Sequence, residues 1–127
     1  MIIIVDDDEA MAETCSMLLE AHGFDVTIAG SGAEALSKIK GVPHELVISD
    51  CAMPDMSALE LSEKLKEDPA TAALPVLLMS GSVRGQIADG SSYDCFLRKP
   101  FLAENLLVEV RKLLAGEPPS TINYVKV

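Results

Sequence analysis

Acidic, hydroxyl and ammonium side chains follow four of the short apolar runs in this sequence, at the points where strands would end. Three aspartates at 6–8 follow the first run, Asp50 follows another, and Ser80 and Lys99 follow two more. Carboxylates that converge repel each other unless a cation lies between them, and Mg²⁺ prefers such oxygen ligands together with water and phosphate oxygens. The pattern therefore indicates a carboxylate site for an ion such as Mg²⁺, with a hydroxyl and an ammonium group beside it.

A simpler interpretation applies to the aspartates at 6–8, because acidic side chains are stabilised at the N-terminus of a following helix. It explains Asp8, but it does not explain why Asp50, which is distant in sequence, should reach the same edge. Flavin or nucleotide binding at this edge is disfavoured, since three aspartates would repel a phosphate. The chain also contains no GxGxxG or GxxxxGK[ST] motif.

Short apolar runs alternate with amphipathic stretches along the chain, which predicts βαβ units and a parallel sheet covered by helices on both faces. The expected strands are 2–5, 25–29, 46–49, 74–79 and 93–97, and the expected helices are 8–21, 32–40, 57–67 and 102–115. Ser31 is expected to cap its helix, with Glu34 in the capping-box position. A glycine- and serine-rich stretch at 82–92 predicts a shortened fourth helix. The fold class is therefore doubly wound, five-stranded α/β, with ligands at the carboxyl ends of the strands.

The composition of the chain limits the kinds of molecule that it could bind and the cellular compartment in which it would work. The 127 residues fit one domain, and a hydrophobic fraction of 49% is sufficient for a packed core. The net charge of -10 argues against nucleic acid and anionic membrane as direct partners. Three separated cysteines without a CxxC motif favour a reducing cytoplasm. The apolar run at 2–5 is too short for a signal peptide or a membrane span.

Four short motifs stand at these strand ends in a fixed order. They are Val5-Asp6-Asp7, Asp50 with Met53-Pro54 after it, Ser80-Gly81, and Lys99-Pro100-Phe101. In this order and spacing the sequence resembles the receiver domain of two-component response regulators, over about residues 1–115. The resemblance implies the flavodoxin-like receiver fold, with a receiver domain at 1–115. The stretch 116–127 is too short to fold alone, so we expect a short tail there and no output domain.

The resemblance implies a role for each matching residue. Asp50 would be the phosphoryl acceptor, whose carboxylate attacks the phosphohistidine of a histidine kinase or a histidine phosphotransfer protein. Lys99 and Ser80 would contact the phosphoryl oxygens and offset the charge that develops during transfer. The remaining matching positions would hold Mg²⁺, and they are Asp6, Asp7, Asp50 and the backbone carbonyl of Ala52.

The resemblance also implies a conformational switch. Phe96 matches the aromatic switch position, so Ser80 and Phe96 would move together when Asp50 is phosphorylated. Phe96 as an ordinary core residue of its strand is an equally weighted alternative. We expect a cytoplasmic signalling protein that passes its state to an unknown downstream protein. Its intrinsic activities would be phosphotransfer and autodephosphorylation, rather than metabolic catalysis.

Two departures from the family pattern keep other functions open. Ser57-Ala58 stand where an Asp-Gly pair is usual, and the stretch between Ser80 and Lys99 is shorter than usual. These departures slightly favour a receiver-shaped interaction module that works without phosphorylation, although the complete set of site residues argues against it. A hydrolase with an aspartyl-phosphate intermediate is a further alternative. It is disfavoured because Ala52 occupies the place of its second acid and no insertion is large enough for a lid.

Overall fold

The computed structural model describes residues 1–51, 55–80, 94–98 and 102–117, and within these ranges the chain forms five strands and four helices. In chain order they are β1 (Ile2–Val5), α1 (Glu9–Ala21), β2 (Val26–Ala29), α2 (Gly32–Gly41), β3 (Leu46–Asp50), α3 (Ala58–Glu67), β4 (Val76–Ser80), β5 (Cys95–Arg98) and α4 (Ala103–Leu114). None of the helices in the described ranges is long and apolar enough to cross a membrane.

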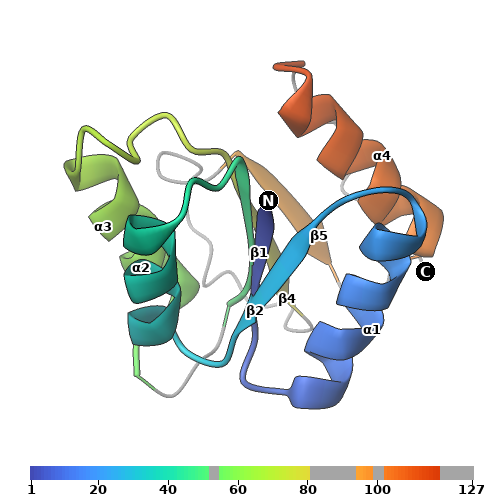
Figure 1. Ribbon diagram of the computed structural model, residues 1–127, viewed down its shortest axis with the longest axis horizontal. Helices are drawn as coiled ribbons and strands as arrows, with labels where there is room; N and C mark the ends of the chain where they lie inside the picture. Colours follow the sequence, from blue (N-terminus) through green and yellow to red (C-terminus); the bar gives the residue numbers. More distant parts are fainter. Residues whose placement is uncertain (52–54, 81–93, 99–101, 118–127) are drawn as a thin grey trace.

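The five strands form one parallel sheet with the order β2-β1-β3-β4-β5. Helices α1 and α4 cover one face of the sheet, and α2 and α3 cover the other (Figure 1). The chain runs from β1 outward to β2 and then returns past β1 to β3, so the strand order reverses between β1 and β3. The predicted doubly wound α/β fold is confirmed, and its ligand-binding crevice is expected at the carboxyl ends of these two strands.

Strand β1 lies in the middle of the core and is buried on both faces. All four of its side chains are fully buried. Ile2 and Ile4 belong to the core beneath α1 and α4, whereas Ile3 and Val5 belong to the core beneath α2 and α3. Full burial of a side chain of this size contributes about 1.5–3 kcal/mol. The strand that leads into the aspartates at 6–8 is therefore held firmly from both sides.

Helix α1 begins and ends where local sequence signals predict. The Asp8 carboxylate accepts hydrogen bonds from the backbone N–H groups of Ala10 at 3.1 Å and Met11 at 3.3 Å, so Asp8 is the N-cap and the helix proper starts at Glu9. Beyond the C-terminus, Gly23 adopts a φ of 92°, in the left-handed region that glycine tolerates. The predicted helix 8–21 is thus confirmed with a one-residue shift at its start.

The last two strands start two residues later than predicted. Pro75 has no N–H group for the sheet ladder, whereas the Val76 N–H donates to the Asp94 carboxylate at 2.8 Å. The Asp94 N–H in turn donates to the Val76 carbonyl at 2.8 Å, so β4 and β5 begin at this paired contact. The shortened fourth helix predicted at 82–92 lies outside the described residues.

Candidate functional site

Three aspartates meet at the carboxyl edge of the sheet. Asp6 directly follows β1 and Asp50 ends β3, and these strands are neighbours with Val5 opposite Ser49. One carboxylate oxygen from each of Asp6, Asp7 and Asp50 lies within 4.8 Å of the other two. The structure therefore brings together the three carboxylates that the sequence placed at this edge. We call them the acidic cluster.

The backbone that carries Asp6 is fixed by its neighbours. The Asp6 N–H donates to the Ala29 carbonyl at the end of β2, at 3.0 Å. One carboxylate oxygen of Asp6 accepts the Asp8 N–H at 3.0 Å, while Asp8 itself caps α1. The predicted role of Asp8 at the helix start and the site position of Asp6 thus coexist, because the Asp8 carboxylate caps α1 while the Asp8 N–H bonds to the Asp6 carboxylate.

The acidic cluster has the composition of a site for a hard divalent cation. Asp6 is only 3% exposed, Asp50 is half-buried and Asp7 is exposed. Burying a carboxylate beside two others is unfavourable unless a positive charge compensates it. Mg²⁺ takes oxygen ligands from one or two carboxylates and keeps several waters, and an open edge with one exposed carboxylate suits that requirement. The residues present therefore fit this ion.

The other predicted site residues differ in how far the structure describes them. Ser80 ends β4, which lies next to β3, and its backbone is paired in register with Arg98. Lys99 follows directly after Arg98, the last residue of β5, but Lys99 and Ala52 lie outside the described residues, as does the side chain of Ser80. Phe96 is half-buried on β5 and packs against the core beneath α2 and α3.

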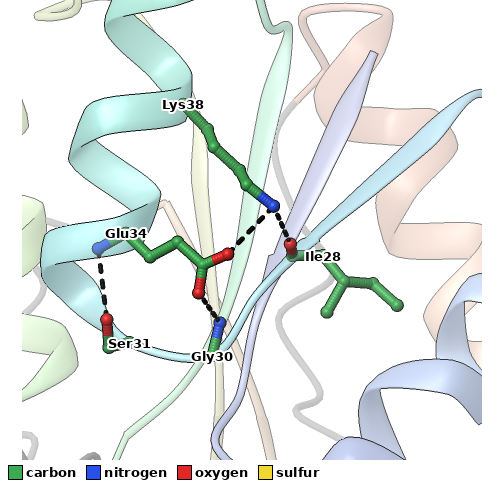
Figure 2. Close-up of polar contacts among 5 residues, drawn as sticks. All are labelled: Ile28, Gly30, Ser31, Glu34 and Lys38. Carbon is green, nitrogen blue, oxygen red and sulfur yellow. Dashed lines mark hydrogen bonds and ion pairs between the residues drawn. The ribbon is translucent and has the colours of Figure 1, made fainter.

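A polar network fixes the turn from β2 into α2 (Figure 2). The Ser31 hydroxyl accepts the Glu34 N–H at 3.1 Å, which confirms the predicted cap. The Glu34 carboxylate, however, accepts the Gly30 N–H at 2.9 Å, one residue before the cap that a capping box would use. Lys38 donates to the Ile28 carbonyl at 2.6 Å and contacts the Glu34 carboxylate at 3.0 Å.

This network has an electrostatic consequence for Glu34. The hydrogen bond from the Gly30 N–H, followed by the hydrogen bond from the Lys38 ammonium group, lowers the pKa of the Glu34 carboxyl below its usual value. Glu34 therefore stays ionised and keeps the turn closed. The turn matters for the site because it begins at Ala29, whose carbonyl accepts the Asp6 N–H.

Sequence reasoning missed one acidic residue, which the structure places against the start of α2. The Asp55 carboxylate accepts the N–H groups of Gly32 at 3.1 Å and Ala33 at 2.9 Å, both in the first turn of α2. The bond from Ala33, then that from Gly32, lowers the pKa of Asp55. No local sequence pattern predicts these contacts, because Asp55 is 23 and 22 positions away from its two partners. The only signal is general: the first backbone N–H groups of every helix need an acceptor from outside the helix.

The start of α3 agrees with prediction. The Ser57 hydroxyl accepts the Glu60 N–H at 3.2 Å, and the Glu60 carboxylate accepts the Ser57 N–H at 3.0 Å. This reciprocal capping box makes Ser57 the N-cap, and the helix proper starts at Ala58 although the usual Asp-Gly pair is absent.

A cavity of about 640 Å³ lies at the opposite edge of the sheet. Its lining includes Glu45, Pro75 and Asp94, each directly preceding a strand. These residues do not match the predicted chemistry, so the acidic cluster remains the candidate site.

Comparison with known proteins agrees with this geometry. The family model of the response regulator receiver domain matches residues 2–111. The chain is 34% identical to the DNA-binding dual master transcriptional regulator RpaA of Synechocystis sp., covering 89% of this chain and 48% of RpaA. It is 28% identical to the DNA-binding response regulator MtrA of Mycobacterium tuberculosis, covering 99% of this chain and 57% of MtrA. The chain thus spans about half the length of these relatives.

A solved structure extends the likeness to the fold. The signal receiver domain of a signal transduction histidine kinase from Syntrophus aciditrophicus superposes with a TM-score of 0.85 at 29% identity, and the match covers 98% of both chains. Receiver domains thus match this chain in sequence and in the path of the backbone.

Proposed function

The chain belongs to the response regulator receiver domain family of two-component systems, and on this basis we propose that Asp50 is its phosphoacceptor. The observation that carries the proposal is the acidic cluster, in which carboxylate oxygens of Asp6, Asp7 and Asp50 lie within 4.8 Å of one another at the strand-order reversal. The phosphoryl donor would be the phosphohistidine of a histidine kinase or of a histidine phosphotransfer protein.

The proposed step is a displacement at phosphorus. A carboxylate oxygen of Asp50 forms the new O–P bond while the P–N bond to the donor imidazole breaks, and the imidazole nitrogen leaves with the electron pair and takes up a proton. The product is an aspartyl phosphate. Lys99 would form an ion pair with a phosphoryl oxygen, and Ser80 would donate its hydroxyl to another, which stabilises the charge of the transition state.

Asp6, Asp7, Asp50 and the backbone carbonyl of Ala52 would hold Mg²⁺. Bound there, the ion would neutralise the charge of the cluster and of the incoming phosphoryl group. Two hydrogen bonds within the chain fix the orientation of Asp6 before any donor binds. The Asp6 N–H donates to the Ala29 carbonyl, and the Asp6 carboxylate accepts the Asp8 N–H.

Ser80 and Phe96 would change conformation when Asp50 is phosphorylated. Ser80 would move toward the phosphoryl group, and the half-buried ring of Phe96 would turn inward behind it. The position of Phe96, partly exposed and packed against the core beneath α2 and α3, is compatible with either the switch or an ordinary packing role. A downstream protein would recognise the changed face.

The partners follow from the family and from charge. The prediction of no direct nucleic-acid contact finds no support in the comparisons, because RpaA and MtrA are both named as DNA-binding regulators. For this chain, with a net charge of -10, we keep protein partners as the proposal. Residence in the cytoplasm is likewise part of the proposal.

Intact-protein mass spectrometry after incubation with acetyl phosphate tests the function. The wild-type protein is expected to gain one phosphoryl group when Mg²⁺ is present, and Asp50→Asn is expected to gain none. Asp68→Asn is the matched control, because Asp68 lies at the far end of α3 and should leave the adduct unchanged. A wild-type protein that binds its partners as tightly as Asp50→Asn and forms no adduct would favour the phosphorylation-independent interaction module.

A further inference from the structure

Asp55 joins two segments that lead to different members of the acidic cluster. Its carboxylate accepts two N–H groups at the start of α2, from Gly32 at 3.1 Å and Ala33 at 2.9 Å. Asp55 itself belongs to the loop between β3 and α3, five positions after Asp50. Because Ser31 already occupies the N-cap of α2, Asp55 acts as a second, non-local cap from another part of the chain.

On the loop side, the connection between Asp55 and Asp50 is short. The Ala58 N–H donates to the Cys51 carbonyl at 3.1 Å, which closes the loop between the end of β3 and the start of α3. Cys51 is the residue directly after Asp50, and its own N–H donates to the Met79 carbonyl of β4 at 2.9 Å. Asp55 is therefore linked to the backbone beside Asp50 through the three residues that follow it and the hydrogen bond from Ala58 to Cys51.

On the helix side, the connection leads to Asp6. Gly32 follows the turn that the Glu34 and Lys38 contacts hold closed (Figure 2). That turn starts at Ala29, whose carbonyl accepts the Asp6 N–H at 3.0 Å. Asp55 thus ties the loop that follows Asp50 to the turn that positions Asp6, on the face of the sheet covered by α2 and α3.

A second contact between the same two segments is apolar. Met56 packs onto Gly32 so closely that a methyl group added at Gly32 would clash with the Met56 Cγ and would lie 2.6 Å from its Sδ. A larger residue at this position would displace the Met56 side chain from the start of α2. Polar and apolar contacts therefore hold one spacing between the loop and the helix.

We propose that Asp55 is a positioning residue for phosphotransfer, which holds the loop after Asp50 against the first turn of α2 and thereby sets the spacing between Asp50 and Asp6. The inference rests on the proposed function of Asp50. Its physical basis is that a nucleophile and the groups that orient its partner must be held to within a fraction of an ångström, so that small displacements cost reaction rate.

The test uses two Asp55 variants, one Gly32 variant and a matched control. Asp55→Ala removes both hydrogen bonds, and Asp55→Asn keeps an oxygen for only one of them. Gly32→Ala leaves Asp55 intact but displaces Met56. Asp68→Asn is the control, because Asp68 also accepts a backbone N–H, from Ala70 at 2.9 Å, but lies at the other end of α3.

Three quantities are measured on folded protein: the rate constant for phosphorylation by acetyl phosphate, the Mg²⁺ concentration for half-saturation, and the metal-free amide resonances of Asp6 and Asp50. For Asp55→Ala we expect phosphorylation about tenfold slower, the loss typical of removing a residue that orients a site. The acetyl phosphate concentration for half-maximal rate should stay unchanged. Asp55→Asn and Gly32→Ala should fall between Asp55→Ala and the wild type, and Asp68→Asn should match the wild type.

A wild-type rate and wild-type Mg²⁺ half-saturation in Asp55→Ala would overturn the inference, even if the variant melts at a lower temperature. If Asp55→Ala does not fold, the same criteria apply to Asp55→Asn and Gly32→Ala. Failure of the wild type itself to form an adduct would refute the proposed function instead. In that case the metal-free amide resonances decide: shifts of both Asp6 and Asp50 in the Asp55 variants support the positioning role, and unmoved resonances overturn it.

Discussion

Removing one carboxylate from the acidic cluster should stabilise the metal-free protein. In Asp50→Asn the side chain keeps its size and its hydrogen-bonding oxygen but loses its charge. One carboxylate oxygen of Asp6 and one of Asp7 lie within 4.8 Å of a carboxylate oxygen of Asp50. At that separation two unit charges repel by about 0.9 kcal/mol in bulk water and by about 3.5 kcal/mol at an effective dielectric constant near 20.

How far each aspartate is exposed to water decides where in this range its repulsion with Asp50 falls. Asp7 is exposed, so its repulsion is close to the value in water, whereas Asp6 is 3% exposed and its repulsion is larger. We therefore expect Asp50→Asn to raise the free energy of unfolding by about 2 kcal/mol in EDTA. For a domain of 127 residues that corresponds to an increase in Tm of about 7 °C.

Mg²⁺ should reverse the order. A ligand at one hundred times its Kd stabilises the folded state by about 2.7 kcal/mol, and Asp50→Asn should gain less because it lacks one ligand carboxylate. Urea unfolding in EDTA and at increasing Mg²⁺ measures both effects. Asp68→Asn controls for the loss of one charge from a protein of net charge -10. The reasoning would be refuted if Asp50→Asn were no more stable in EDTA than Asp68→Asn. It would also be refuted if Mg²⁺ stabilised both variants equally.

Three further predictions follow from individual contacts. Burial and the nearby Glu109 carboxylate raise the pKa of the Cys95 thiol to about 12, so iodoacetamide at pH 8 should alkylate Cys95 only after unfolding, as peptide mass spectrometry would show. The backbone hydrogen bonds to Asp55 lower its pKa, so it stabilises the fold above its unfolded-state pKa and loses that effect as pH falls; carboxyl NMR should give a midpoint below the usual aspartate value, and Asp55→Asn should flatten the acid limb of the stability curve. Ser57→Ala should cost about 1 kcal/mol in urea unfolding, whereas Ser57→Thr should cost much less, because threonine keeps a hydroxyl oxygen that can accept the Glu60 N–H and alanine does not; equal losses would contradict the capping role.

Much of the fold was predictable because it depends on local patterns. The run of β-branched residues in β1 indicated a strand buried on both faces, and Asp8, Ser31 and Ser57 marked three helix starts that the structure contains. The starts of β4 and β5 were less predictable. They depend on Asp94, whose carboxylate accepts the Val76 N–H across 18 positions of sequence.

The candidate site also has features that the sequence could predict and features that it could not. The aspartates of the acidic cluster were predictable, since the carboxyl ends of neighbouring parallel strands meet at one edge. The sequence did not predict that Asp6 is buried and Asp7 exposed. This difference depends on the hydrogen bond from the Asp6 N–H to the Ala29 carbonyl and on the direction of the chain into α1. The contact of Asp55 with α2 was missed for the same reason: it links residues that only the tertiary fold brings together.

The most direct test of the central claim is the chemical identity of the modified residue. Borohydride reduces an aspartyl phosphate to homoserine, so protein treated with acetyl phosphate and Mg²⁺, then reduced and digested, should contain homoserine at position 50. Omission of Mg²⁺ should abolish the conversion, and Asp50→Asn should show none. Homoserine at another aspartate, or a phosphoryl adduct that survives with Asp50 unchanged, would contradict the assignment of Asp50 as the phosphoacceptor.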